Sequence, residues 1–178
     1  MVPRLLPAER RADLADRLTA QLMRALDGAR RRALRDGDRQ IDTAHLLHSL
    51  VEADPEAAAA LGDADRRARV LGYLVQRSIG YGLRWQRSVE DTGATLPVLR
   101  GAETGAAGWS PAAAAALAGA FDRAAHRGAL RGDSRVRGLD LLAALAVDRD
   151  SRAAEVLRRA GVDPGALTAR IEHPSQQV

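Results

Sequence analysis

Two histidines, His45 and His48, lie three residues apart in a segment whose apolar pattern predicts a helix. At this spacing two imidazoles share one helix face, and imidazole nitrogen is a common ligand of zinc. No third ligand accompanies the pair on that face, and the chain has no cysteine. We therefore expect no metal at this pair, and a structural or solvated role for both histidines at the start of a helix.

Groups for catalysis are also missing. The chain has no Ser-His-Asp set, carboxylate pair or Cys-His pair in a context that supports chemistry. It has no Gly-x-x-x-x-Gly-Lys-Ser/Thr phosphate loop, and every basic residue other than histidine is arginine, as is typical of GC-rich genomes. The sequence predicts a protein that is not an enzyme and that has no cofactor.

Arginines cluster in the first long helical segment, at Arg30, Arg31, Arg32 and Arg35. Such a cluster is typical of surfaces that contact nucleic acid or an acidic protein. Over the whole chain, however, 23 acidic residues are interspersed with the 27 basic ones. We favour a solvated helix face, and a nucleic-acid-associated regulator that uses this helix is the alternative function.

The elements that carry these residues occur twice. The segment Ile41–Leu50 is answered by Val136–Leu145, with leucine pairs at matching positions. Each copy follows a Gly-Asp turn, at 37–38 or 132–133, and a helix rich in Ala and Arg, and each precedes a short Ala-rich helix. This internal duplication indicates two similar helical units packed together, with a groove between them that can bind a ligand.

The composition limits the fold and the location. Alanine and leucine dominate and aromatic residues make up only 3%, which predicts an all-α protein. No apolar run approaches the roughly 20 residues that a membrane span needs. The N-terminus mixes acidic and basic residues and does not resemble a signal peptide. With no cysteine in the chain, we expect a cytoplasmic protein that makes no membrane contact.

Glycine and proline divide the chain into segments. Glycines and a proline between the two copies predict a long linker, while Asp54-Pro55, Ser110-Pro111 and Asp163-Pro164 predict helix starts. The predicted organisation is an irregular lead-in at 1–10, a first repeat at 11–80, a linker at 81–108, a second repeat at 109–172 and a flexible tail at 173–178.

This arrangement resembles the amino-terminal domain of the Clp ATPases of the ClpA and ClpC type, which is a double Clp repeat. The family motif Ile-Gly-Thr-Glu-His-Leu-Leu corresponds to Ile41–Leu47 and, less closely, to Val136–Leu142. The opening of the repeat corresponds to Leu18-Thr19 in the first copy and to Trp109–Pro111 in the second. The resemblance covers roughly residues 15–172. Without a phosphate loop, it implies a freestanding domain with no ATPase module.

The resemblance implies a fold of two pseudo-symmetric four-helix repeats that form a non-enzymatic binding module. Its implied partners are the Clp unfoldase, adaptor proteins and the peptide degrons of substrates. Such a module would either deliver substrates to a Clp protease or act as a decoy. A decoy would sequester adaptors or cyclic-peptide antibiotics away from the ATPase.

The resemblance also implies where a ligand binds. In Clp amino-terminal domains that bind phosphorylated arginine, the glutamate of each Thr-Glu-His contacts the ligand, and the matching residues here are Ala44 and Leu139. Losing a carboxylate–guanidinium contact costs about 1.5–3 kcal/mol, or more than about tenfold in affinity. We therefore expect weak phosphoarginine binding and an altered pocket. The candidate pocket residues are Thr43, Ala44, His45, Gly138, Leu139 and Asp140.

Trp109 is the remaining candidate. In the same family, the aromatic residue that opens the second repeat belongs to a patch that binds cyclic-peptide antibiotics, and tryptophan often dominates contact energies. The other patch positions are Ala15, Asp27 and Ala106, which do not reproduce its apolar and histidine character. We favour the alternative, in which Trp109 packs onto its own helix as a hydrophobic staple.

Overall fold

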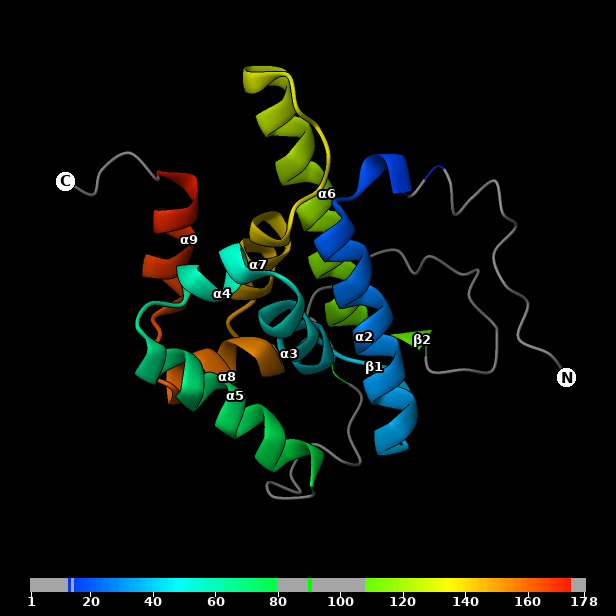
Figure 1. Cartoon of the computed structure of the whole chain (residues 1–178), viewed down its shortest axis with the longest axis vertical. Helices are drawn as coiled ribbons and strands as arrows, with labels where there is room; N and C mark the ends of the chain where they lie inside the picture. The colour runs from blue at the N-terminus through cyan, green and yellow to red at the C-terminus, as the bar shows by residue number, and fades with distance from the viewer. Residues whose placement is uncertain (1–12, 14, 80–89, 91–107, 174–178) are drawn as a thin grey trace, which may run out of the picture.

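The computed structural model describes residues 13, 15–79, 90 and 108–173, and these residues are mainly helical (Figure 1). The helices are α2 (Ala20–Asp36), α3 (Thr43–Ala53), α4 (Pro55–Ala60), α5 (Ala64–Ser78), α6 (Pro111–Arg131), α7 (Gly138–Val147), α8 (Arg152–Arg159) and α9 (Pro164–Glu172). Two short strands, β1 (Gln40–Ile41) and β2 (Gly108–Trp109), complete the described elements. The predicted all-α fold is confirmed. Within the described ranges, no helix is long and apolar enough to cross a membrane.

The predicted lead-in, most of the predicted linker and most of the predicted tail lie outside the described residues. Tyr81, Leu83 and Trp85, whose apolar side chains suggest that the linker docks on the core, also lie outside them. The predicted repeat and linker boundaries therefore stay predictions.

Side-chain caps begin most of the described helices, as the sequence predicts for several of them. The N-cap side chains that accept backbone N–H groups are Thr19, Asp42, Asp54, Asp63, Ser110, Ser151 and Asp163. Gly37 and Gly132 end α2 and α6 in the left-handed conformation, with φ of 71° and 81°. Because that conformation suits glycine, the two Gly-Asp turns reverse the chain after each long helix.

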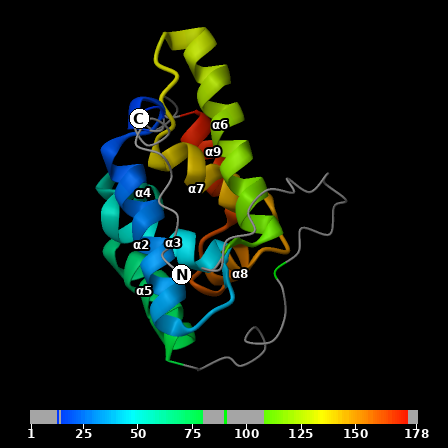
Figure 2. The ribbon, with the colours of Figure 1, turned by 90° about the vertical axis from the view of Figure 1, so that its right-hand side faces the viewer.

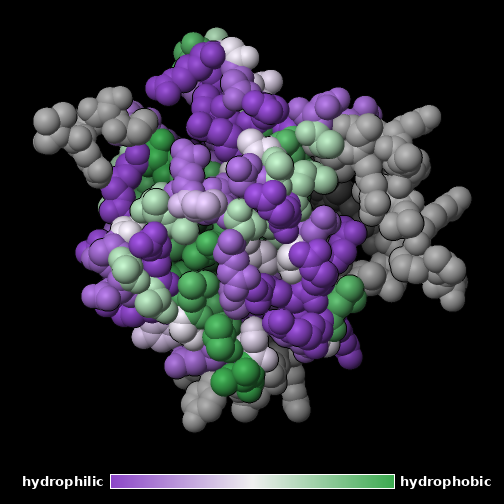
Figure 3. All heavy atoms as spheres, in the orientation of Figure 1, coloured by the Kyte–Doolittle hydropathy of each residue, from purple (hydrophilic) through white to green (hydrophobic). Residues whose placement is uncertain are grey.

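The buried core lies between α3 and α7, which occupy the middle of the molecule (Figures 1 and 2). Nine successive residues of α3, from 43 to 51, are buried, so this helix has no solvent-facing side over most of its length. The long helix α2 covers α3 with the alanines Ala25, Ala29 and Ala33, and α6 covers α7 in the same way with its own alanines. Small side chains let these helix axes approach closely. Hydrophilic side chains cover much of the face shown in Figure 3.

The two copies of the motif are joined by reciprocal backbone pairing. The residue pair Leu18 and Val136, just before α2 and α7, forms a parallel bridge. The strands before α3 and α6 also pair in parallel, with Ile41 opposite Trp109. Each entry segment of one copy therefore pairs with an entry segment of the other, which is the pattern of a pseudo-twofold axis.

Arginines repeat this reciprocal pattern at the ends of the short helices. The Arg69 guanidinium on α5 donates to the carbonyl of Ala160 after α8, at 3.1 Å. Arg170 on α9 donates to the carbonyl of Ala60 at the end of α4, at 3.0 Å. A cation at a helix C-terminus satisfies a free carbonyl and complements the helix dipole. The last helix of each copy thus caps the short helix of the other.

Gly138 begins α7 in close contact with the junction between α3 and α4. A Cβ atom at this position would overlap the carboxylate of Asp54, which is fixed by hydrogen bonds to the amides of Glu56 (3.0 Å) and Ala57 (3.1 Å). The absence of a side chain at 138 lets α7 sit directly on the N-terminus of α4.

We expect Gly138→Ala to lower the free energy of unfolding by about 1–3 kcal/mol, because the added methyl displaces a carboxylate that caps another helix. Urea denaturation followed by circular dichroism measures the change. Gly72→Ala on α5 is the matched control, since an added Cβ there meets nothing within 4 Å. That variant should gain up to about 1 kcal/mol from helix propensity. A Gly138→Ala protein as stable as the Gly72→Ala protein would contradict the proposed overlap.

Candidate functional site

The residues that the sequence singles out lie at the starts of α3 and α7. Thr43, Ala44 and His45 form the first turn of α3, and each is at most 1% exposed. Gly138 and Asp140, at the start of α7, are also buried, whereas Leu139 and Trp109 are half-buried. Trp109 lies in β2 and packs against the core, beside the strand that leads into α3.

The two halves of the candidate pocket face different neighbours. Thr43 meets the start of α8, where its hydroxyl accepts the amide of Ala153 at 3.0 Å. Gly138 meets the start of α4 through Asp54. The structure thus places the start of each motif helix against the short helix of the other copy. The two halves of the candidate pocket therefore contact different residues.

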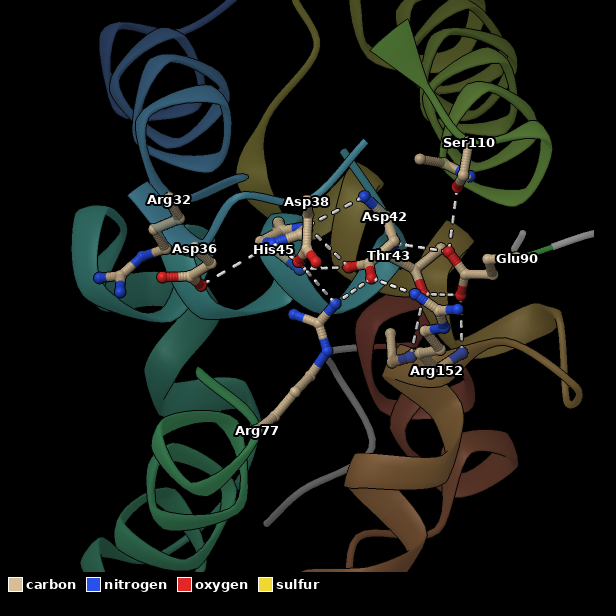
Figure 4. Close-up of polar contacts among 12 residues, drawn as sticks. Arg32, Asp36, Asp38, Asp42, Thr43, His45, Arg77, Glu90, Ser110 and Arg152 are labelled. Atoms are coloured by element: carbon tan, nitrogen blue, oxygen red, sulfur yellow. Dashed lines mark hydrogen bonds and ion pairs between the residues drawn. The ribbon is translucent and has the colours of Figure 1, made fainter. Parts of the chain in front are cut away.

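A buried carboxylate, that of Glu90, joins three helix N-termini (Figure 4). It accepts the amide of Thr43 at 2.8 Å and the amide of Arg152 at 2.7 Å, at the starts of α3 and α8. It also accepts the hydroxyls of Thr43 and Ser110, the latter at 3.0 Å, at the start of α6. Glu90 is 5% exposed. Helix N-termini favour negative charge, and here α3 and α8 each offer an N–H group while α6 offers the hydroxyl of its N-cap serine.

A second buried carboxylate, that of Asp42, lies next to the first (Figure 4). It pairs with Arg152 at 2.6 Å and with Arg77, and its Oδ1 lies 2.9 Å from Nδ1 of His45. Burial alone would raise the pKa of Asp42, but the hydrogen bond with His45 and the charge of Arg77 together lower it below its ordinary value. Asp42 therefore stays ionised in the folded protein and holds α5 and α8 against the start of α3.

The second copy places opposite charges at the matching positions. Arg137 stands where Asp42 stands, and Asp140 stands where His45 stands. The Asp140 carboxylate accepts the Arg137 amide at 2.8 Å and pairs with Arg127 of α6 at 2.7 Å. Each copy has a capped and charge-compensated helix start, but only the first combines an imidazole with several carboxylates in the described part of the chain.

His48 faces away from His45. Its Nε2 lies 3.3 Å from a carboxylate oxygen of Glu52, and Arg32 donates to that same carboxylate. Burial and the nearby guanidinium of Arg32 lower the pKa of His48 to about 4. His48 is therefore neutral at physiological pH, and the structure does not bring the two histidines together as one ligand pair.

An apolar groove of about 290 Å³ lies between α6 and α7 and reaches Thr43 at the start of α3. Ala115 and Gly119 of α6 and Ala144 and Val147 of α7 line it. We call this cavity the α6–α7 groove. Val147 is 59% exposed at its rim.

Sequence reasoning missed Glu90. The residue lies in a glycine-containing stretch with no helical or strand periodicity, so no local pattern marks it as buried. Its partners Thr43 and Ser110 are recognisable only as helix caps. The single available signal is indirect: three helix starts that face one another require a common acceptor.

We expect Glu90→Gln to lower the free energy of unfolding by about 1–3 kcal/mol, because an amide supplies one acceptor oxygen where four donors meet a carboxylate. Thermal and urea denaturation measure the loss. Glu172→Gln is the control, since that exposed carboxylate pairs with Arg123 on the surface, and its loss should cost less than about 1 kcal/mol. Equal losses in the two variants would show that Glu90 does not hold the helix starts.

His48 should make the folded protein less stable in mild acid. Between its ordinary pKa near 6.5 and its folded pKa of about 4, the unfolded chain binds a proton that the folded chain does not. The free energy of unfolding should therefore fall as the pH falls through this window. Urea denaturation at pH 7 and pH 5 tests this, and His48→Gln should show a smaller fall than His126→Gln, whose histidine is exposed. Identical pH slopes in the two variants would exclude His48 as the cause.

No protein-family model matches the chain. The chain is 30% identical over 156 residues to the chaperone protein ClpB of Rhodopseudomonas palustris, and the match covers 88% of the chain but 16% of ClpB. A solved structure from a study of a malarial protein secretion system is similar over 89% of the chain, with 15% identity and a TM-score of 0.61. The N-terminal domain of the chaperone ClpD from Arabidopsis thaliana is similar over 91%, with 18% identity and a TM-score of 0.57. These structures are covered over 94% and 96% of their own lengths.

Proposed function

Because this chain has the fold of a Clp amino-terminal domain, we propose that it is a non-enzymatic binding module that engages exposed peptide segments of proteins in the Clp system. The observation that carries this proposal is the α6–α7 groove, an apolar cavity that opens to the surface between two packed helices. The similarity to one part of a longer chaperone supports a role in recognition rather than in ATP hydrolysis.

A short extended segment with small aliphatic side chains is the occupant that the α6–α7 groove fits best. A volume of about 290 Å³ is at the lower end of the range for binding sites, so the cavity suits a few side chains. Alanine, glycine, leucine and valine form most of its walls and offer apolar contact, while Thr43 and Ser151 add hydroxyl groups. At the rim, Arg123 and Asp148 carry opposite charges, which favours a segment with little net charge.

Phosphorylated arginine remains a poor ligand in this proposal. Ala44 is fully buried and Leu139 has no charge, so neither supplies a carboxylate to a guanidinium. Asp140, the acid next to Leu139, already pairs with Arg127. Contact between Trp109 and a cyclic peptide stays a prediction. The half-buried ring packs on the core, Ala15 and Asp27 are exposed, and Ala106 lies outside the described residues.

We expect fluorescein-labelled casein, an unfolded protein, to bind the chain with an affinity that depends on the α6–α7 groove. Ala115→Glu and Val147→Asp should each weaken binding about tenfold, because an occupant would bury the new charge without a partner. Fluorescence anisotropy measures the affinity. Val75→Asp is the matched control, since Val75 on α5 is 48% exposed and lies outside the groove.

Unchanged binding in both groove variants would place the contact elsewhere and exclude the groove. A loss of affinity that follows rising salt, together with binding to DNA, would instead favour the nucleic-acid alternative on α2. That alternative has less support, because Arg32 and Arg35 already pair with Glu52 and Asp36.

Delivery and sequestration share this binding step and differ in its consequence. Adding the chain to a Clp protease that degrades a fluorescent client separates them. Faster degradation is expected of delivery, and slower degradation is expected of a decoy. In both cases the effect should disappear with Val147→Asp and persist with Val75→Asp.

A further inference from the structure

Two charged side chains lie toward opposite ends of the α6–α7 groove. The two helices are joined by residues 132–137 and run in opposite directions (Figure 1). A Cβ atom at Gly119 would lie 3.4 Å from the Cβ of Ala144, so the helices pack against each other at these residues. Arg123 lies about one turn beyond Gly119 on α6, and Asp148 lies about one turn beyond Ala144 on α7. Because the helices are antiparallel, these two turns lead away from each other.

Asp148 lacks a partner of opposite charge among the described residues, whereas Arg123 has one. The Arg123 guanidinium pairs with Glu172 of α9 at 2.6 Å. Oδ1 of Asp148 accepts the amide of Asp150 at 3.1 Å, but its Oδ2 is buried and accepts no hydrogen bond from any described residue. A buried polar atom without a hydrogen bond is costly and rare in proteins. This oxygen therefore indicates a donor that a bound molecule supplies.

The end of α7 adds to the negative potential around Asp148. This residue is the C-cap of α7, where backbone carbonyl groups form the negative end of the helix dipole. No basic residue lies in the last turn of α7, whereas α2, α5, α6, α8 and α9 each have an arginine in theirs. A carboxylate at a helix C-terminus is unfavourable by itself. A cation that enters the groove would compensate both the carboxylate and the helix end.

The first copy of the repeat shows a carboxylate with a structural role at the matching end of its motif helix. Asp54 is the C-cap of α3, and its side chain also caps α4 by accepting two backbone amides at the start of that helix. In the second copy the hydroxyl of Ser151 caps the short helix α8 instead. The capping of α8 therefore does not use Asp148, and the side chain of Asp148 lines the groove.

We propose that Asp148 makes the α6–α7 groove selective for segments that carry a basic side chain, lysine or arginine, beside small aliphatic residues. This selectivity rests on the function proposed above, because the groove must first accept a peptide segment. The aliphatic residues contact the apolar walls, and the cationic nitrogen donates to the Asp148 carboxylate at the end of the groove that Ser151 lines. Because Glu172 already pairs with Arg123, an acidic side chain gains no equivalent partner at the other end.

The surroundings of Asp148 favour a charged donor over a neutral one. Hydrogen bonds between an ionised donor and a carboxylate are about twice as strong as neutral ones. Pairs at fully exposed sites contribute little because water and salt screen them, but Asp148 is half-buried at the edge of an apolar groove, where screening is weaker. Lysine or arginine should therefore bind more tightly than a neutral side chain of similar length.

Fluorescence anisotropy of three labelled peptides with the full chain tests the proposal. Each peptide consists of alanine and valine around one central lysine, glutamine or glutamate, and both of its ends are blocked. The lysine peptide should bind about tenfold more tightly than the glutamine peptide, and the glutamate peptide should bind most weakly. Asp148→Asn should bind the lysine and glutamine peptides equally, and Asp148→Lys should prefer the glutamate peptide. Asp150→Asn, which removes an exposed acid two residues away, should keep the preference for lysine.

Three results would overturn the proposal. Equal binding of the three peptides, lost in Val147→Asp, would leave the groove as a peptide site without charge selection, and the proposed function would stand. A preference for lysine that persists in Asp148→Asn, or that Asp150→Asn reduces as much, would indicate only general attraction to acidic residues. No binding of any peptide would also overturn the selectivity. Casein binding that depends on the groove would then keep the proposed function, and its absence would reject both.

Discussion

The N-termini of α3, α6 and α8 converge on the carboxylate of Glu90, and the placement of the other helices depends on this convergence. Three positive dipole ends pointing at one another repel unless a negative group lies between them. The buried amides also need an acceptor, because water does not reach them. One carboxylate meets both requirements. It belongs to neither motif copy, so the contact ties α3 of the first copy to α6 and α8 of the second.

The two copies have similar backbone folds but different charged side chains at the starts of α3 and α7. At the start of α3 the carboxylate of Asp42 pairs with Arg77 and Arg152 and lies beside the imidazole of His45. At the start of α7 the carboxylate of Asp140 pairs with Arg127 of α6 and accepts the amide of Arg137. Both helix starts have capping hydrogen bonds. The first places an imidazole nitrogen among carboxylates, and the second has none.

Much of the fold was predictable because its signals are local. Asp54-Pro55, Ser110-Pro111 and Gly37 act through their own backbone, so their sequence context predicts where helices begin and end. The candidate site was predicted less completely. The spacing of His45 and His48 suggests a shared face, yet α3 is buried on all sides and each ring finds a different partner. Asp36 and Asp38 reach His45 only through the chain reversal at Gly37. Glu90 depends wholly on tertiary contacts.

The paired contacts between the copies are reciprocal, as in a symmetric homodimer. The entry segments exchange backbone pairing, and Arg69 and Arg170 each cap a helix of the opposite copy. An isologous interface of this kind normally depends on the concentration of subunits. Here both partners are parts of one chain, so association is intramolecular and independent of dilution. The two partners need not be identical, because each copy is a separate segment of the same chain with its own sequence. A sequence change in either copy can therefore specialise one face of the assembly, which a dimer of identical subunits cannot do.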